Sequence, residues 1–294
     1  MQLRSKTYRN YLKKHGRENQ FFITAYIGID LINSVEDKPT ELSTSWKPRD
    51  IENSKIESKF FIQKSSLAYS VSTFEAFFDD FFLKEICNLN IIDSPFIERI
   101  NGSDSKKSIF KKMELLVNNF QNLKTKEYYL VKSAIFWRND LVHNVNIKFD
   151  SDLKSHLKNY IKDYSESYKN LDINELIMNH DCFKVPSFKE TLSLMTSLRN
   201  FAAQINNFFM NEVAIDDYIK MILIQQMELG NIKNISNNTP DKKRKKYWDN
   251  VISTYVGLDK EGQQFFQESE FARELYKVKS IAELKNLLEA KEIL

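Results

Sequence analysis

The stretch from Phe188 to Phe209 constrains the fold of this chain more than any other part of the sequence. Its apolar side chains recur every three or four positions for about six helical turns. Ser187, just before the stretch, and Glu190, in its first turn, form a capping box, in which each side chain satisfies a free backbone N–H group at the helix start. A helix this long must bury its apolar stripe against other elements. The stripe consists of Phe188, Leu192, Met195, Leu198, Ala202, Ile205 and Phe209.

The rest of the chain is also predicted to be helical. Only 6 glycines and 5 prolines occur in 294 residues, too few for tight-turned β architectures. We therefore expect an all-α fold. Pro39 and Pro48 mark residues 34–58 as a loop or linker, and Gly257 ends a helix. Apolar spacing and a second capping box at Ser280 to Glu283 predict helices over 1–33, 60–89, 109–120, 126–142, 151–169, 241–256 and 280–290.

The same pattern predicts three segments. Residues 1–57 form an N-terminal helical extension and linker, 58–215 a helical bundle, and 216–294 a small C-terminal helical subdomain. An Asn- and Ser-rich stretch over 231–240 fits a boundary inside the last segment.

Several function classes are excluded. Glycine-rich phosphate loops are absent, and Cys87 and Cys182 are expected to be buried free thiols. The sequence His180-Asp181-Cys182 lacks metal-ligand spacing, so neither a metal nor a cofactor is expected. No signal peptide and no apolar stretch of roughly 20 residues is found, which predicts a cytoplasmic chain that does not enter a membrane. The net charge of +3 is too small to indicate a nucleic-acid partner by itself.

Three residues with complementary chemistry stand together at the end of the helix predicted over 126–142. Metal-free RNA cleavage needs proton transfers, which suit the imidazole of His143, because an unperturbed histidine has a pKa near 6.5. It also needs a cation on the phosphate, which suits the planar guanidinium of Arg138. Asn139 can orient a phosphate oxygen or the imidazole.

The spacing of these residues adds a geometric condition. Arg138 and His143 point roughly 140° apart on a straight helix, whereas Asn139 and His143 share a face. The two converge only if the helix ends or bends near His143, or if a second copy of the chain completes the site. Residues 144–146 are expected to form the helix exit, and a twofold dimer would bring two such ends together.

Arg138-Asn139 followed by His143, at the end of an apolar helix, resembles the signature of the HEPN superfamily. The resemblance covers about residues 58–212 and includes an earlier helix with Thr73 to Phe77. It implies a homodimeric helical bundle that cleaves RNA without a metal, leaving a 2′,3′-cyclic phosphate. It also implies a toxin or antiphage effector, which a protein partner inhibits or activates. Val145 stands where one branch of the family has a tyrosine that an antitoxin modifies, so that branch is not indicated.

Supporting residues and alternatives accompany this interpretation. Glu75 either holds Arg138 or His143 in the cleft or is a solvated carboxylate, and Asp140 is a second supporting candidate. Arg138 and His143 could instead form a salt-bridged, capped helix end. Arg9-Asn10 followed by His15 repeats the pattern in a polar segment, so the letters alone are weak evidence. A silent HEPN-like module that binds a protein, nucleotide or nucleic acid is the alternative function.

A basic run near the C-terminus is the second candidate for contact with RNA. Its cations would attract a phosphate backbone, and the following Tyr247 and Trp248 could stack on bases. The alternatives are a solvated helix face with Trp248 in the core, or a nucleic-acid-binding protein centred on this tail. The run consists of Lys242, Lys243, Arg244, Lys245 and Lys246.

Overall fold

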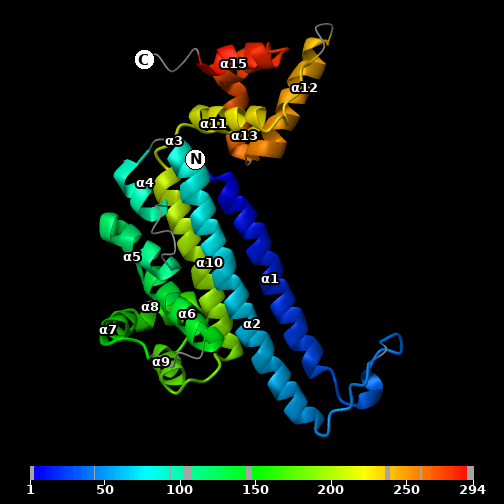
Figure 1. Ribbon diagram of the computed structural model, residues 1–294, viewed down its shortest axis with the longest axis vertical. Coiled ribbons are helices and arrows are strands. Elements are labelled where there is room, and N and C mark those ends of the chain that lie inside the picture. The colour runs from blue at the N-terminus through cyan, green and yellow to red at the C-terminus, as the bar shows by residue number, and fades with distance from the viewer. Residues whose placement is uncertain are drawn as a thin grey trace. The chain divides into compact units, whose positions relative to one another are not determined.

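A computed structural model describes the protein over residues 3–42, 44–89, 91–92, 94–101, 108–143, 148–235, 239–258 and 260–289. All regular elements among these residues are helices, and none is a strand (Figure 1). The all-α prediction is therefore confirmed. No helix within the described ranges combines the length and apolar character needed to cross a membrane.

The chain divides into two compact units that interleave along the sequence. One comprises residues 1–9, 79–103 and 205–294, and the other comprises 10–78 and 104–204. The long helices α1 (Lys6–Asp30), α2 (Ile51–Asp80) and α10 (Phe188–Met210) contribute residues to both. The units follow contacts rather than chain order, so the three consecutive segments proposed from the sequence stay a prediction.

In the unit of residues 10–78 and 104–204, α1, α2 and α10 run side by side (Figure 1). Phe22 of α1 stacks on Phe188 of α10 with ring centroids 5.2 Å apart, and Tyr11 packs on Phe77 of α2 at 4.9 Å. The capping box before α10 is confirmed, because Ser187 N donates to Glu190 Oε2 and Glu190 N to Ser187 Oγ. Side chains of the N-terminal helix, predicted as part of an extension, thus pack in the core of this unit.

Polar side chains also join α1 to its neighbours. Glu18 accepts hydrogen bonds from Thr73 (2.6 Å) and Ser70 (3.2 Å) of α2, and His15 Nε2 lies 2.8 Å from the carbonyl of Met195. Burial raises the pKa of Glu18 and lowers that of His15, because it disfavours the charged form of each group. The second Arg-Asn…His match therefore places its histidine in the core, at 4% exposure.

Shorter helices cover the other side of this unit. Trp137 of α6 is fully buried and donates from Nε1 to the carbonyl of Lys184 (3.0 Å). Residues 151–169 were predicted as one helix but form two that meet at Tyr160, so that prediction is wrong in this detail. The sequence missed α9, whose start is capped by Asp172, because nine residues give too little periodicity. The elements are α5 (Ile109–Asn119), η3 (Gln121–Leu123), α6 (Lys126–His143), α7 (Ser151–Asn159), α8 (Ile161–Ser167) and α9 (Ile173–Asp181), with η1 (Val35–Asp37) before α2.

The start of α2 corrects the predicted loop. The helix begins at Ile51, so residues 51–58 are helical rather than part of a linker. Asp50 caps this start by accepting a hydrogen bond from Asn53 N (3.0 Å). The first turns carry few apolar residues, and periodicity therefore gave no signal there.

The other unit gathers helices around the buried carboxyl of Glu85. This group accepts from Thr7 N at the first turn of α1 (2.7 Å) and lies 3.5 Å from the Tyr218 hydroxyl. Burial raises its pKa. Gly257 ends η4 in the left-handed region (φ 64°), as the sequence predicted. The elements are η2 (Phe81–Ile86), α3 (Cys87–Leu89), α4 (Ser94–Asn101), α11 (Ile215–Glu228), α12 (Asp241–Val251), η4 (Ile252–Val256), α13 (Lys260–Glu268), α14 (Glu270–Leu275) and α15 (Ile281–Glu289).

Candidate functional site

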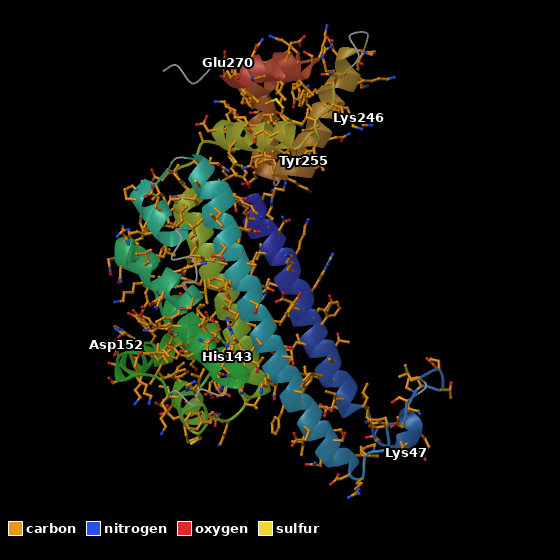
Figure 2. All side chains as sticks on the ribbon, viewed as in Figure 1. Lys47, His143, Asp152, Lys246, Tyr255 and Glu270 are labelled. Atoms are coloured by element: carbon orange, nitrogen blue, oxygen red, sulfur yellow. The ribbon has the colours of Figure 1, made fainter. Side chains whose placement is uncertain are left out.

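The last turn and a half of α6 opens onto a pocket. Arg138, Asn139 and His143 all line it, and Glu75 of α2 lines the same space, which measures about 390 Å³. α6 ends at His143, whose side chain is exposed (Figure 2). The three motif residues thus border one pocket despite their angular separation. The exit predicted over residues 144–146 and the position of Val145 lie outside the described residues.

Arg138 is the most constrained of the pocket's polar groups. Its side chain is 17% exposed, and its Nη2 lies 3.4 Å from Glu75 Oε2. The Nε atom is buried, and no described residue accepts a hydrogen bond from it. The contact predicted between Glu75 and Arg138 is therefore present, at a distance beyond that of a strong charge-assisted bond. Most of the guanidinium's donor capacity remains for an anion.

Asn139 and His143 stand beside Arg138 with their polar atoms available. Within the part of the chain that the structure describes, neither side chain has a hydrogen-bond partner. The alternative of a histidine that caps terminal carbonyls has no contact to support it among these residues. A ligand with acceptor atoms could therefore bind both side chains.

A separate helix supplies the rest of the pocket wall. Ser108 and Ile109 stand at the start of α5, and Phe136 lies on α6 with its ring 5.2 Å from that of Phe110. Ser108 occupies the N-cap position, but its side chain makes no capping hydrogen bond. The partial positive charge of a helix N-terminus favours an anion at this wall. The sequence did not identify Ser108 and Ile109, because they join the site only through tertiary packing.

Asp140 of α6 is buried and does not line the pocket. Its side chain is 6% exposed, and its Oδ1 has no hydrogen-bond partner among the described residues. Its charge acts on His180 of α9, which is fully buried and stacks on Phe149 with centroids 3.7 Å apart. Asp140 is thus not a supporting residue of the pocket.

Burial dominates the electrostatics behind α6. It lowers the pKa of His180 to about 4, although the nearby carboxylates of Asp140 and Asp181 oppose the shift. Lys154, which pairs with Asp181 at 2.7 Å, adds to the lowering. His180 is therefore a neutral core residue at neutral pH.

Metal ligands do not converge in the described ranges. No group of three or more His, Cys, Asp or Glu side chains there is arranged to hold an ion. Cys87 and Cys182 are free thiols as predicted, but both are exposed, so their predicted burial is wrong.

The basic run lies on α12 and divides into two kinds of residue. Lys242, Lys243, Lys245 and Lys246 are exposed, whereas Arg244 is 7% exposed. Arg244 donates to the carbonyls of Tyr276 (2.8 Å) and Thr239 (3.3 Å) and to Asp241. Arg244 therefore stabilises the fold, and of the five predicted RNA-binding residues only the four lysines are exposed.

Trp248, predicted either to stack on bases or to lie in the core, lies in the core. It is 2% exposed, and its Nε1 donates to the carbonyl of Val278. It is therefore not exposed for base stacking.

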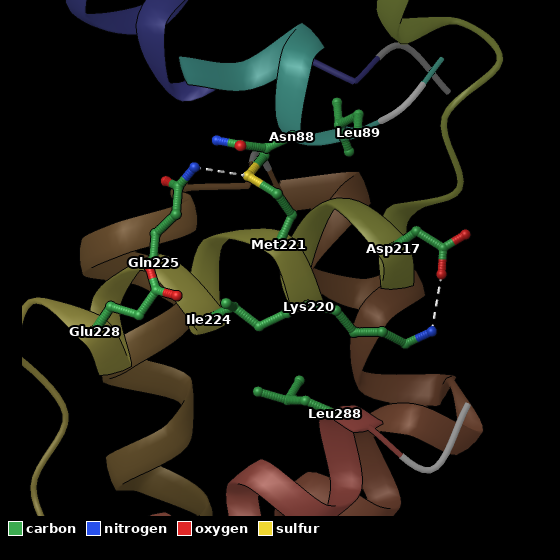
Figure 3. A pocket seen from close by; sticks show the side chains of 9 residues that line it. All are labelled: Asn88, Leu89, Asp217, Lys220, Met221, Ile224, Gln225, Glu228 and Leu288. Carbon is green, nitrogen blue, oxygen red and sulfur yellow. Dashed lines mark hydrogen bonds and ion pairs between the residues drawn. The ribbon is translucent and has the colours of Figure 1, made fainter. Parts of the chain in front are cut away.

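A further pocket of about 370 Å³ lies along α11, between α3 and α15 (Figure 3). Lys220 pairs there with Asp217 at 2.8 Å, and Gln225 Nε2 lies 3.1 Å from Met221 Sδ. None of the residues predicted from the motif or the basic run lines it. Lys220, the one cation among the described residues that line it, is already paired, which distinguishes this pocket from the one at α6.

No protein-family model, curated protein or solved structure matches the chain. The class of site is therefore defined by its own residues. An all-helical protein carries a pocket in which arginine, asparagine and histidine side chains face one space with hydrogen-bond donors to spare. Such a set suits a phosphodiester.

Proposed function

We propose that the chain is a metal-independent endoribonuclease of the HEPN type, with Arg138, Asn139 and His143 as its catalytic residues. The observation that supports the proposal most is that all three line one pocket at the end of α6. The Nε of Arg138 is buried and has no acceptor among the described residues, so the fold leaves part of the guanidinium unsatisfied.

The reaction follows from the chemistry of the three side chains. The 2′-oxygen of a ribose forms a bond to the neighbouring phosphorus, and the bond from phosphorus to the 5′-oxygen breaks. The proton of the 2′-hydroxyl leaves to a base, and the 5′-oxygen receives a proton from an acid. The products carry a 2′,3′-cyclic phosphate and a 5′-hydroxyl.

Each residue has a role in this scheme. Arg138 stabilises the negative charge that develops on the phosphorane oxygens, and Asn139 orients a phosphate oxygen. His143 carries out proton transfer, because imidazole exchanges protons near neutral pH. Glu75, 3.4 Å from Arg138, limits the rotation of the guanidinium.

One pocket contains one histidine, whereas the scheme has two proton transfers. We propose that a second copy of the chain supplies the other group in a twofold dimer, as the spacing of Arg138 and His143 first suggested. Mixing an Arg138→Ala chain with a His143→Ala chain tests this point. A composite site restores part of the cleavage in the mixture, whereas independent sites leave it inactive.

The main test is cleavage of a labelled RNA oligonucleotide by the full chain in EDTA. Cleavage that continues and leaves cyclic phosphate ends supports the proposal. Arg199→Ala is a matched control for Arg138→Ala, because Arg199 is an exposed arginine on α10. Loss of all cleavage on chelation, or full activity in both site variants, would reject the mechanism.

A role as a toxin or defence effector belongs to the same proposal. Expression of the wild-type chain in a bacterial host should arrest growth, and His143→Ala should relieve the arrest. Equal arrest by both chains would separate toxicity from the pocket.

A further inference from the structure

α12 presents lysines to solvent on one side. Lys242, Lys243, Lys245 and Lys246 form what we call the lysine surface, and all four are exposed. At about 100° per residue, they spread over the side opposite the buried Arg244. The surface is thus a feature of the folded helix, and the run of five cations in the sequence contributes four charges to it.

The acidic groups near this surface are engaged elsewhere. Asp241 binds Arg244, and Asp249 accepts a hydrogen bond from the Tyr276 hydroxyl (2.7 Å). None of the four lysines has an ion-pair partner within the described ranges. Their positive charge is therefore not compensated locally.

A pocket of about 400 Å³ opens beside the surface. Lys242 and Lys245 line it together with Tyr276, Lys277 and the paired Asp241 and Arg244, and Lys245 Nζ lies 5.2 Å from the centre of the Tyr276 ring. Lys277 pairs with Glu274 at 2.7 Å, so Lys242 and Lys245 are the lining cations without an ion pair among the described residues. A phosphate group there could contact two ammonium groups from successive turns of one helix. The surface therefore combines general positive charge with a local recess for an anion.

We propose that the lysine surface binds the phosphate backbone of RNA. Phosphates suit it because lysines act as point charges toward a repeating anion and need no fixed geometry. An apolar contact for a protein or lipid partner is not supplied by the neighbouring aromatics. Trp248 is buried, and the Tyr247 hydroxyl bonds to the backbone of Lys233. The choice of RNA among polyanions rests on the proposed function, whereas phosphate binding does not.

The test is the affinity of a fluorescent single-stranded RNA for the full chain with His143→Ala, which prevents cleavage during titration. Four lysine contacts give a slope of about −2.8 for the logarithm of affinity against that of salt, or roughly a 50-fold loss between about 50 and 200 mM. Replacing all four lysines with glutamine should weaken binding at least tenfold and make the slope shallower by about 2.8, the contribution of four contacts.

The matched control replaces Lys13, Lys14, Lys158 and Lys162, four exposed lysines of the other unit, with glutamine. It removes the same charge and should change the affinity less than threefold. An equal loss of affinity in both variants would show that only the net charge of the chain matters, and it would overturn the proposal. Unchanged binding in the α12 variant would overturn it as well.

Two further arms separate the outcomes. Vesicles of phosphatidylserine test a membrane surface, and binding of vesicles but not of RNA would overturn the proposal in favour of lipid. Cleavage by the wild-type chain is measured in parallel. RNA that binds through the four lysines without being cut would contradict the proposed function and leave the lysine surface standing. Cleavage by the wild-type chain, together with unchanged RNA binding in the variant without the four lysines, would support the proposed function and contradict the lysine surface.

Discussion

Two arginines that the sequence assigned to RNA have opposite surroundings. Arg138 of α6 faces a pocket, makes one long contact with Glu75, and has a buried Nε without a described acceptor. Arg244 of α12 lies in the core of a small helical cluster and donates to two carbonyls and a carboxylate. Arg138 thus retains hydrogen-bond donors for a ligand, whereas the donors of Arg244 bind groups of the fold itself.

The difference shows what marks a binding residue in this molecule. Both side chains are largely buried and permanently charged, so neither burial nor charge separates them. The contacts of the two guanidinium groups do, because among the described residues Arg138 makes one long contact with Glu75, whereas Arg244 makes three hydrogen bonds. Arg138 therefore has a reason to meet an anion that Arg244 lacks.

The largest expected effect is on RNA cleavage. His143→Ala and Arg138→Ala should each reduce the cleavage rate by about 10² to 10⁴-fold, because proton transfer and charge stabilisation are lost. His143→Ala should change the free energy of unfolding by less than about 0.5 kcal/mol, since the side chain is exposed. Single-turnover rates and thermal unfolding measure the two quantities. Unaltered cleavage in Arg138→Ala would show that Arg138, like Arg244, has no role in binding or cleaving RNA at the pocket.

The next effect lies on the inner side of α6. His180 binds a proton near pH 4 when folded but near pH 6.5 when unfolded, so it costs stability as pH falls through this range and nothing above it. The loss should reach roughly 3 kcal/mol near pH 4. Glu18 and Glu85, whose pKa values are raised, act in the opposite direction in every variant. Urea unfolding from pH 7 to pH 4 should therefore show a weaker acid loss for His180→Phe than for wild type. Equal pH slopes would contradict the neutral core histidine.

Methionine at each arginine compares their structural roles directly. Arg244→Met should lower the free energy of unfolding by about 2 to 3 kcal/mol, because two carbonyl acceptors lose a charged donor. Arg138→Met should cost less than about 1 kcal/mol, because its pair with Glu75 is long and partly solvated. Chemical denaturation measures both changes. A larger loss of unfolding free energy in Arg138→Met than in Arg244→Met would show that Arg138 is the arginine that stabilises the fold.

The smallest effect concerns the carboxylate beside Arg138. Glu75→Gln should slow cleavage about tenfold or less, because Arg138 keeps its charge and loses only a positioning contact. The exposed Glu57 on the same helix offers the control Glu57→Gln. Cleavage rates at saturating RNA separate the two. A loss as large as that of Arg138→Ala would instead indicate that Glu75 takes part in proton transfer.

Much of the fold could be predicted from the sequence, because the apolar residues of a long amphipathic helix recur at a spacing that is visible in the sequence. The stripe of α10, its capping box and the end at Gly257 all follow from local rules. The short α9, the break at Tyr160 and the polar start of α2 do not, since they depend on packing or on one capping side chain.

The candidate site was predictable only in part. Arg138, Asn139 and His143 stand together in the sequence, and the prediction of a nearby helix end agrees with α6 ending at His143. Ser108 and Ile109 join the pocket through tertiary contacts, which no local pattern encodes. Asp140 lies within the motif and Arg244 within the basic run, and nothing in the sequence indicated that either is buried. Both side chains are buried because of packing against other helices.

The most direct test of the catalytic proposal compares two oligonucleotides of one sequence, one made of RNA and the other of DNA, in EDTA. A site that uses the 2′-hydroxyl as nucleophile must cut the first and leave the second intact, because only RNA carries that group. We predict cleavage of the RNA alone, with cyclic phosphate ends, and its loss in His143→Ala. Cleavage of both strands, or of neither, would contradict the account of the pocket at the end of α6.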